Sequence, residues 1–252
     1  MLEGYFLFLY SALFVVVTNM SVKLKMGFNN NFIINSSYTK FLGVTMDNTL
    51  SWNNHIDTLM KKLSMACYII RNAKMYMSAL SLKVIYYPFF HSAMIYGIIF
   101  WGKSSHSSII FRIQKKKAIR IMEGCGNRVS CRNLFKKIQV LPLTSQYMLS
   151  LLIFVVQKKK FFSTNNENHN IDTKQRNNLH LPQANLTIYQ KRAYYSGIKI
   201  FNHLPLEIKD AAGNQKKFKN ALKKFYTLIH FIQWKSTLVN RELCTVSQDF
   251  LL

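Results

Sequence analysis

Residues 51–77 read SWNNHIDTLMKKLSMACYIIRNAKMYM, and this stretch indicates the fold class. Its apolar side chains recur at steps of three and four residues, as on one face of an amphipathic α-helix. They are Ile56, Leu59, Leu63, Cys67, Ile70 and Met77. Ser51 precedes them and is a residue type that caps helix N-termini. Lys61, Lys62, Arg71 and Lys74 lie mostly off the stripe, so we expect an amphipathic helix.

Helical periodicity continues toward the C-terminus in further segments. They span residues 82–100, 108–122, 134–154, 189–201 and 218–229. Pro88 should kink the first of these, because proline lacks an amide hydrogen and crowds the preceding turn. Trp101-Gly102 should end it, and Gly124 should end the second. Leu141-Pro142-Leu143 should interrupt the third.

Residues 21–48 have a strand-like pattern instead. Val22, Leu24 and Met26 alternate with polar residues, and residues 32–34 and 41–45 are short apolar runs. Residues 27–31 are typical of a turn, and Asp47-Asn48 closes the region as another turn. The sequence therefore predicts a mainly α fold with short strands before the first helix.

The chain is strongly basic yet rich in apolar residues. It has 252 residues, 34 Lys and Arg against 10 Asp and Glu, a net charge of +24, and 49% hydrophobic residues. This apolar content allows a core, in one large or two small domains, and is unlike that of a disordered basic tail. The charge is atypical of a cytosolic enzyme and favours a polyanion as partner.

Candidate catalytic and metal sites are few. Cys67, Cys125, Cys131 and Cys244 form no Cys-x-x-Cys pair, so we expect reduced thiols. No histidine stands at zinc-ligand spacing from Cys125 and Cys131. No Gly-x-Ser-x-Gly or phosphate-loop pattern is present. We therefore predict no catalytic residue, no metal site and no small-molecule substrate.

Residues 4–17 are uncharged and apolar, but a membrane span needs about 20 such residues. Only Glu3 precedes them, whereas a signal peptide begins with positive charge. Three interpretations stay open: a buried strand or helix, unrelated upstream sequence, or a membrane anchor. The last would make the chain a membrane-associated basic protein, which is the alternative function.

Several sequence blocks follow one another in a fixed order. They are Lys40-Phe41-Leu42-Gly43-Val44, Leu50-Ser51-Trp52, His55-Ile56, Tyr86 with Phe90-His91-Ser92, Tyr96-Gly97-Ile98-Ile99-Phe100-Trp101-Gly102, Gln114-Lys115, Ala118-Ile119-Arg120, Cys131-Arg132, Leu134-Phe135-Lys136, Gly197, Phe201-Asn202, Leu204-Pro205 and Phe218-Lys219. The set resembles the C-terminal part of reverse transcriptases of jockey-like non-LTR retrotransposons. The resemblance covers about residues 22–226 and rests on the order of the blocks, since each alone is weak.

The resemblance implies a domain organisation. In that family the Phe-Leu-Gly block forms the palm-end hairpin that supports the primer strand, which implies a primer grip at Phe41, Leu42 and Gly43. A small antiparallel β-hairpin (21–48) would precede a helical thumb-like region (49–125). A C-terminal helical extension (126–227) would follow, with a polar linker near 158–178. The apolar segment 1–20 and the tail 228–252 would lie outside the family.

The chain departs from the family where polymerisation takes place. Intact enzymes hold two Mg²⁺ ions with palm carboxylates that precede the Phe-Leu-Gly block. Residues 1–40 contain Glu3 and no aspartate, and none of the five aspartates is adjacent to another. Asp47 fits a turn and Asp57 a first helical turn. We therefore expect a truncated, inactive remnant of an RNA-directed DNA polymerase, with no cofactor of its own.

Basic residues are the candidate nucleic-acid contacts. They are Lys61, Lys62, Arg71, Arg112, Lys115, Lys116, Lys117, Arg120, Arg128, Arg132, Lys136 and Lys137. Lys116 and Arg120 share a helix face that would meet successive phosphates, with a plain solvated face as the alternative. The run Lys158-Lys159-Lys160 is more typical of solvated charge.

Three aromatic residues allow two interpretations. Trp52, Tyr96 and Trp101 have the spacing of core residues, with base stacking as the alternative. The expected partner is RNA, DNA or their hybrid, bound without sequence preference. The chain would then act in the nucleus or cytoplasm as a ribonucleoprotein, or at a membrane if residues 4–17 anchor it.

Overall fold

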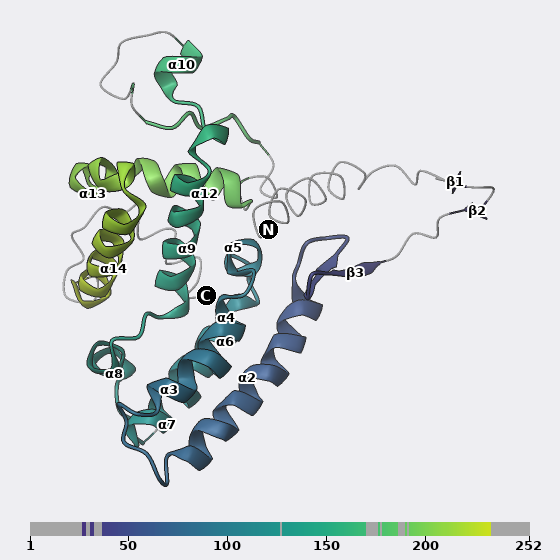
Figure 1. Ribbon diagram of the computed structural model, residues 1–252. Helices are drawn as coiled ribbons and strands as arrows, with labels where there is room; N and C mark the ends of the chain where they lie inside the picture. Colours follow the sequence, from purple (N-terminus) through teal and green to yellow (C-terminus); the bar gives the residue numbers. More distant parts are fainter. Residues whose placement is uncertain are drawn as a thin grey trace. The chain divides into compact units, whose positions relative to one another are not determined.

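The computed structural model describes residues 27–28, 31–32, 37–126, 128–169, 176, 178–185, 190 and 192–232 (Figure 1). The interpretations of residues 4–17, of a strand at 22–26 and of the chain beyond residue 232 lie outside the described residues. Contacts divide the chain into two compact units, Met1–Asp57 and Thr58–Leu252. The described elements are mainly helical and begin with antiparallel hairpins, which confirms the predicted fold class.

The first unit contains two hairpins. β1 (Gly27–Phe28) pairs with β2 (Asn31–Phe32), and β3 (Tyr38–Phe41) pairs with β4 (Val44–Asp47). The strand expected at 41–45 is wrong, because the chain reverses at Leu42-Gly43, where φ is 47° and 80°. Two positive φ angles are typical of a type I′ turn, whose twist matches that of paired strands. The turn expected at 27–31 contains β1 and the first residue of β2, which pair in antiparallel orientation.

Asp47 ends β4 and organises the entrance to helix α2 (Asn53–Ala73). Its carboxylate accepts hydrogen bonds from the hydroxyls of Thr49 and Ser51 (both 2.6 Å) and from the amides of Ser51 and Trp52 (both 3.0 Å). Burial raises the pKa of this carboxyl, but the hydrogen bonds outweigh burial and hold the pKa at about 2. Ser51, the predicted cap, accepts one long bond of 3.5 Å from the Asn53 amide.

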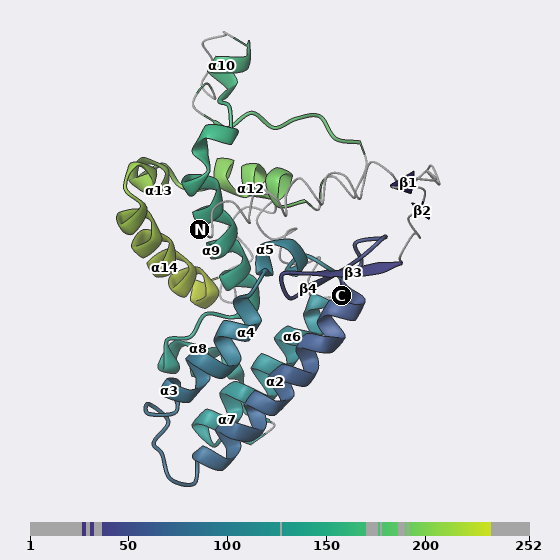
Figure 2. The same cartoon turned by 45° about the vertical axis from the view of Figure 1, so that its right-hand side comes forward.

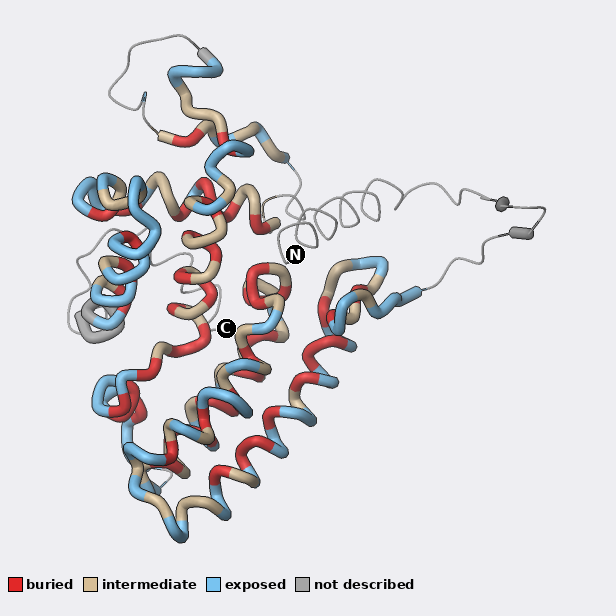
Figure 3. Tube along the Cα trace, viewed as in Figure 1, coloured by how far each residue is buried: buried red, intermediate tan, exposed pale blue. Residues whose placement is uncertain are grey.

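Helix α2 has the predicted amphipathic pattern. Ile56, Leu59, Leu63, Cys67 and Ile70 are all buried. In Figure 3, buried and exposed segments alternate along this helix. It ends at Ala73, before Met77, so the last residue of the predicted stripe lies in the connection that follows.

The next predicted helix contains a wide, π-helical turn. It runs through α3 (Lys83–Ile85), the π turn η1 (Tyr86–His91) and α4 (Ser92–Ile95). Pro88 lies in η1, where the Ser92 amide donates to the Tyr87 carbonyl, so the wider turn accommodates the missing proline amide. The helix does not continue to Phe100, because Tyr96 is extended and Gly97 has a φ of 63°. Helix α5 (Ile98–Trp101) then ends at Gly102, as predicted.

The following helix repeats this construction. It comprises α6 (Ser107–Ile113), the π turn η2 (Gln114–Ile119) and α7 (Arg120–Glu123), and it ends at Gly124 as predicted. The fully buried Gln114 donates to the Tyr86 hydroxyl (3.0 Å) and the Leu141 carbonyl (3.1 Å). Its Oε1 accepts from the Leu143 amide (2.9 Å). One side-chain amide therefore connects both π turns to the segment that begins the next long helix.

The remaining described elements follow the predicted order with changed bounds. They are α8 (Cys131–Ile138), α9 (Leu143–Gln157), η3 (Lys159–Phe161), α10 (Asn165–His169), α12 (Ala193–Asn202), α13 (Leu206–Asp210), η4 (Ala211–Gly213) and α14 (Gln215–Ile232). The interruption before Leu143 is confirmed. The polar segment after α9 is not all loop, because Thr164 and Glu167 form a capping box that starts α10 (2.7 and 3.3 Å).

Helix α9 forms the core of the second unit and packs against α12 and α14 (Figures 1 and 2). Figure 3 shows almost no exposed segment along it. Glycine permits this packing at two points. A Cβ on Gly197 of α12 would lie 2.7 Å from Val155 Cγ2, and one on Gly102 would lie 2.5 Å from Tyr147 Cδ2. The glycine backbone lies so close to these α9 side chains that a larger residue would force them to move.

Candidate nucleic-acid interface

The second unit begins with a long stretch that has no carboxylate side chain. Residues 58–122 contain eleven Lys and Arg and no Asp or Glu. The predicted contacts that are exposed in this stretch are Lys61, Lys62, Arg71, Arg112, Lys116 and Lys117, whereas Lys115 and Arg120 are half-buried. These cations face solvent with no acid in the same stretch, and such a surface attracts polyanions.

The fold brings basic residues of α2 and η2 together around a buried thiol. Burial raises the pKa of Cys67 to about 11, and the charges of Lys117 and Arg71 lower it in part. Both cations therefore lie near the same point, although they belong to different helices. Lys74, just beyond α2, lies close to Gly124 at the end of α7: a Cβ on this glycine would be 2.7 Å from the Lys74 Nζ. Figure 2 shows the lower end of α2 near α7.

Arg120 positions a loop. Its Nη2 donates to the Val129 carbonyl at 2.9 Å, and its Nε is buried. Arg120 thus fixes the segment that leads into α8, whereas Lys116 and Lys117 are exposed on the preceding turn. The lysines are therefore more accessible to phosphate than Arg120.

The second predicted patch lies in and before α8. Arg128, Arg132, Lys136 and Lys137 are all exposed. The Cys131 thiol at the start of α8 donates to the Lys115 carbonyl (3.2 Å), so this patch adjoins η2.

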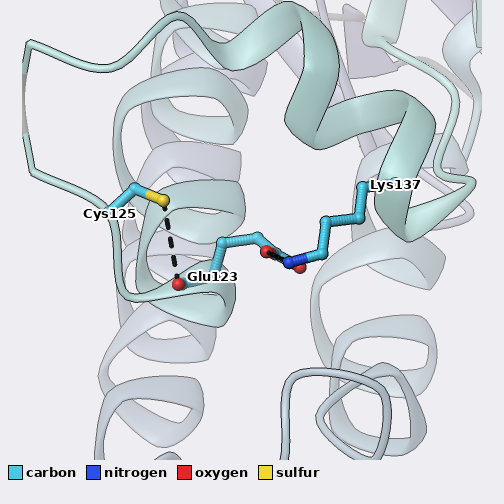
Figure 4. Close-up of polar contacts among 3 residues, drawn as sticks. All are labelled: Glu123, Cys125 and Lys137. Atoms are coloured by element: carbon cyan, nitrogen blue, oxygen red, sulfur yellow. Dashed lines mark hydrogen bonds and ion pairs between the residues drawn. The ribbon is translucent and has the colours of Figure 1, made fainter.

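Lys137 of that patch forms an ion pair with a residue of α7. Figure 4 shows its ammonium group against the carboxylate of Glu123, while the Cys125 thiol contacts the Glu123 carbonyl (3.7 Å). The hydrogen bond to Glu123 raises the pKa of Lys137. The Glu123 side chain is only 5% exposed, so the pair ties α8 to α7.

The residues assigned to a primer grip lie at the tip of the β3–β4 hairpin. Phe41 ends β3 opposite Val44, and Leu42 and Gly43 form the turn. Leu42 and Gly43 are exposed and Phe41 is half-buried. Exposed backbone at a glycine is open to close approach by another chain. These residues belong to the first unit, whereas the basic surface belongs to the second.

The aromatic candidates divide between core and surface. Trp52 and Trp101 are core residues, and the Trp101 indole donates to the Tyr96 carbonyl (3.0 Å). Tyr96 itself is 52% exposed, so the core interpretation is wrong for this residue. Sequence reasoning missed Tyr68 and Tyr76, which are exposed. The signal for Tyr68 was present, because it lies off the apolar stripe of α2.

A lysine–serine contact in the second unit lacks the features of a nucleophile and its base. Lys103 Nζ donates to Ser196 Oγ (3.3 Å), and the serine hydroxyl donates to the Gln190 carbonyl (3.0 Å). An activated serine gives its proton to a base, which a carbonyl is not. Ser196 is buried, so these bonds hold α12 to the turn before α6.

Cysteine and histidine positions give no metal site in the described part of the chain. No group of three or more His, Cys, Asp or Glu side chains gathers there in a way that would hold a metal ion. Cys67, Cys125 and Cys131 are free thiols, and the first and last are buried.

Comparisons with known proteins add no relative. No family model, no curated protein and no solved structure matches this chain. Among the described helices, no single one has the length and hydropathy to cross a membrane. The helices α8 and α9, which are bent by 47° relative to each other, together have the required length and hydropathy.

Proposed function

We propose that this protein binds RNA, DNA or their hybrid, without sequence preference, through the cationic surface of α2, η2 and α8. The observation that carries the proposal is the stretch 58–122, which has eleven basic residues and no acid and exposes most of its predicted contacts. Phosphate groups bound to such a surface release counterions, and this release supplies most of the free energy of non-specific binding.

We further propose that the chain corresponds to the thumb and C-terminal region of a non-LTR reverse transcriptase and has no polymerase activity of its own. The order of the sequence blocks supports the correspondence. Gly102 and Gly197 belong to those blocks, and each lies against a side chain of α9, which gives a physical reason for both glycines. Because residues 1–40 contain no aspartate, we expect no nucleotide incorporation with Mg²⁺ and a primed template. Incorporation by the purified chain would contradict this.

Salt dependence tests the proposed binding directly. Fluorescence anisotropy of the full chain with a labelled duplex should give an association constant that falls steeply between about 50 and 200 mM salt. The double variant K116Q/K117Q should reduce the slope of log K against log salt by up to about 2, since each phosphate contact contributes about 0.9. An association constant that does not depend on salt, or no binding at low salt, would refute the proposal.

A matched control separates this surface from net charge. Lys159 and Lys160 are exposed in η3, so K159Q/K160Q removes the same charge from another site. We expect this control to change the slope by less than half as much as K116Q/K117Q. Equal effects of the two double variants would show that overall charge, and not the α2–η2–α8 surface, governs binding.

The membrane alternative remains a separate proposal that rests on residues 4–17. Deletion of residues 1–20 should abolish co-sedimentation with neutral liposomes if this segment is an anchor. Binding of nucleic acid should persist in the deletion variant, because every proposed phosphate contact lies beyond residue 57.

A further inference from the structure

Two exposed tyrosine side chains belong to α2 and to the connection that follows it, beside the cationic residues of that helix. Tyr68 in α2 is 62% exposed, and Tyr76 in the connection to α3 is 92% exposed. Met65 and Met75 are also exposed, at 68% and 81%. Large apolar side chains gathered on one surface commonly mark an interaction site.

The helix geometry places these side chains among basic residues. Lys61, Met65 and Tyr68 are separated by four and three residues and therefore share one face of α2. Arg71 follows Tyr68 by three residues, and Lys61 and Arg71 lie about 15 Å apart along the helix at 1.5 Å per residue. The Tyr68 ring thus stands between two exposed cations on one helix.

Tyr76 continues this surface beyond the end of α2. Hydrogen-bonded turns extend the chain there, with the Met75 amide on the Asn72 carbonyl (3.3 Å) and the Tyr76 amide on the Ala73 carbonyl (3.0 Å). The neighbouring Lys74 reaches toward Gly124. Tyr76 therefore lies in the turn that follows the α2 cations, two residues from the lysine that reaches the end of α7.

Charge decides which kind of partner fits. A protein partner recognised by these cations would have to supply carboxylates, whereas a nucleic acid carries a phosphate at every nucleotide. Unpaired nucleobases offer a π face for each ring, while their phosphates meet the flanking cations. Bases inside a duplex are stacked on one another and cannot offer that face.

We infer that the exposed face of α2 and its following turn bind single-stranded RNA or DNA, with Tyr68 and Tyr76 as stacking platforms for unpaired bases and Lys61, Lys62 and Arg71 on the phosphates. The inference rests on the proposed nucleic-acid binding and specifies it. Stacking is sequence-tolerant because every base has a π face, which agrees with the absence of base-specific readout.

The test compares oligothymidine with an abasic oligonucleotide of the same length, both titrated into the full chain by anisotropy. The abasic strand keeps the phosphates and lacks the bases. We expect the intact protein to bind oligothymidine at least about tenfold more tightly than the abasic strand. The double variant Y68L/Y76L should remove this difference and leave the affinity for the abasic strand unchanged within about twofold.

Two controls make the result specific. Y68F/Y76F keeps both rings and should retain the preference for oligothymidine, and F161L removes an exposed ring in η3 and should also retain it. Equal binding of both strands by the intact protein, or a preference that persists in Y68L/Y76L, would overturn the inference. Failure to bind either strand at low salt would instead refute the proposed nucleic-acid binding itself.

Discussion

Helix α9 and the outer face of α2 are both helical but have opposite roles. Helix α9 packs in the core, whereas the outer face of α2 is exposed to solvent. Helix α9 carries no charged residue, seven of its fifteen residues are buried, and only Gln157 is exposed. The outer face of α2 carries Lys61, Lys62 and Arg71 with an exposed tyrosine between them. Changes around α9 should therefore alter stability, whereas changes on the outer face of α2 should alter binding and leave stability almost unchanged.

The largest effect is expected at Gln114. Q114A leaves the Tyr86 hydroxyl, the Leu143 amide and the Leu141 carbonyl without their buried partner, so we expect the free energy of unfolding to fall by about 3 kcal/mol or more. Urea denaturation measures this. Q157A, at an exposed position of α9, should change it by less than about 0.5 kcal/mol. Similar values for the two variants would contradict the central role of Gln114.

The next effect tests the close contact between α12 and α9. The added methyl group in G197A would meet the stiff β-branched side chain of Val155, and we expect a loss of about 1–3 kcal/mol. V155A should relieve the clash, so the double variant G197A/V155A should be less destabilised than the sum of the single variants. Additive losses in this cycle would show that the two residues do not touch.

A smaller effect is expected at Asp47, which lies outside the α9 core. Its folded-state pKa is lowered to about 2, so the ionised carboxylate stabilises the fold above about pH 4, and this contribution is lost as the pH falls toward 2. We expect about 1 kcal/mol after allowance for solvent screening. D47N should have a lower melting temperature than the intact protein at pH 6 and a similar one near pH 2. A constant difference at both pH values would argue against this linkage.

The smallest change in stability is expected on the cationic face. K116Q/K117Q alters two exposed side chains and should change the free energy of unfolding by less than about 0.5 kcal/mol, although it weakens nucleic-acid binding. Urea denaturation of the same preparation used for the anisotropy measurement checks this. A large loss of stability would mean that these lysines support the fold, and the contrast between α9 and α2 would fail.

The sequence predicted the existence of most helices and the interruption before Leu143, but it missed the π turns and the break at Tyr96-Gly97. The stripe of α2 and the stop at Gly124 follow from local rules of periodicity and capping. The π turns η1 and η2 do not, because a wider turn is stabilised by what it packs against, here the contact between Tyr86 and Gln114. The hairpin turn at Leu42-Gly43 was also missed, since a leucine at positive φ has no local signal.

The sequence alone predicted that the candidate surface is basic, but it did not predict how the basic side chains are arranged on it. The basic residues could be named from the sequence, but Arg120 and Lys137 could not be told apart from solvated cations. Their partners, the Val129 carbonyl and the Glu123 carboxylate, are set by how the loop and α8 return to α7. The exposure of Tyr68 and Tyr76 is known only from the tertiary structure, because a tyrosine near an apolar stripe is usually part of the core.

By itself, the sequence determined the helical class, the amphipathic face of α2 and a positive surface, since these depend on residue type and periodic spacing. Tertiary structure alone decided which cations remain accessible, how α2 and η2 meet around Cys67, and why glycine stands at 102 and 197. These features depend on contacts between residues far apart in the chain. Spacing within one segment carries no information about such contacts.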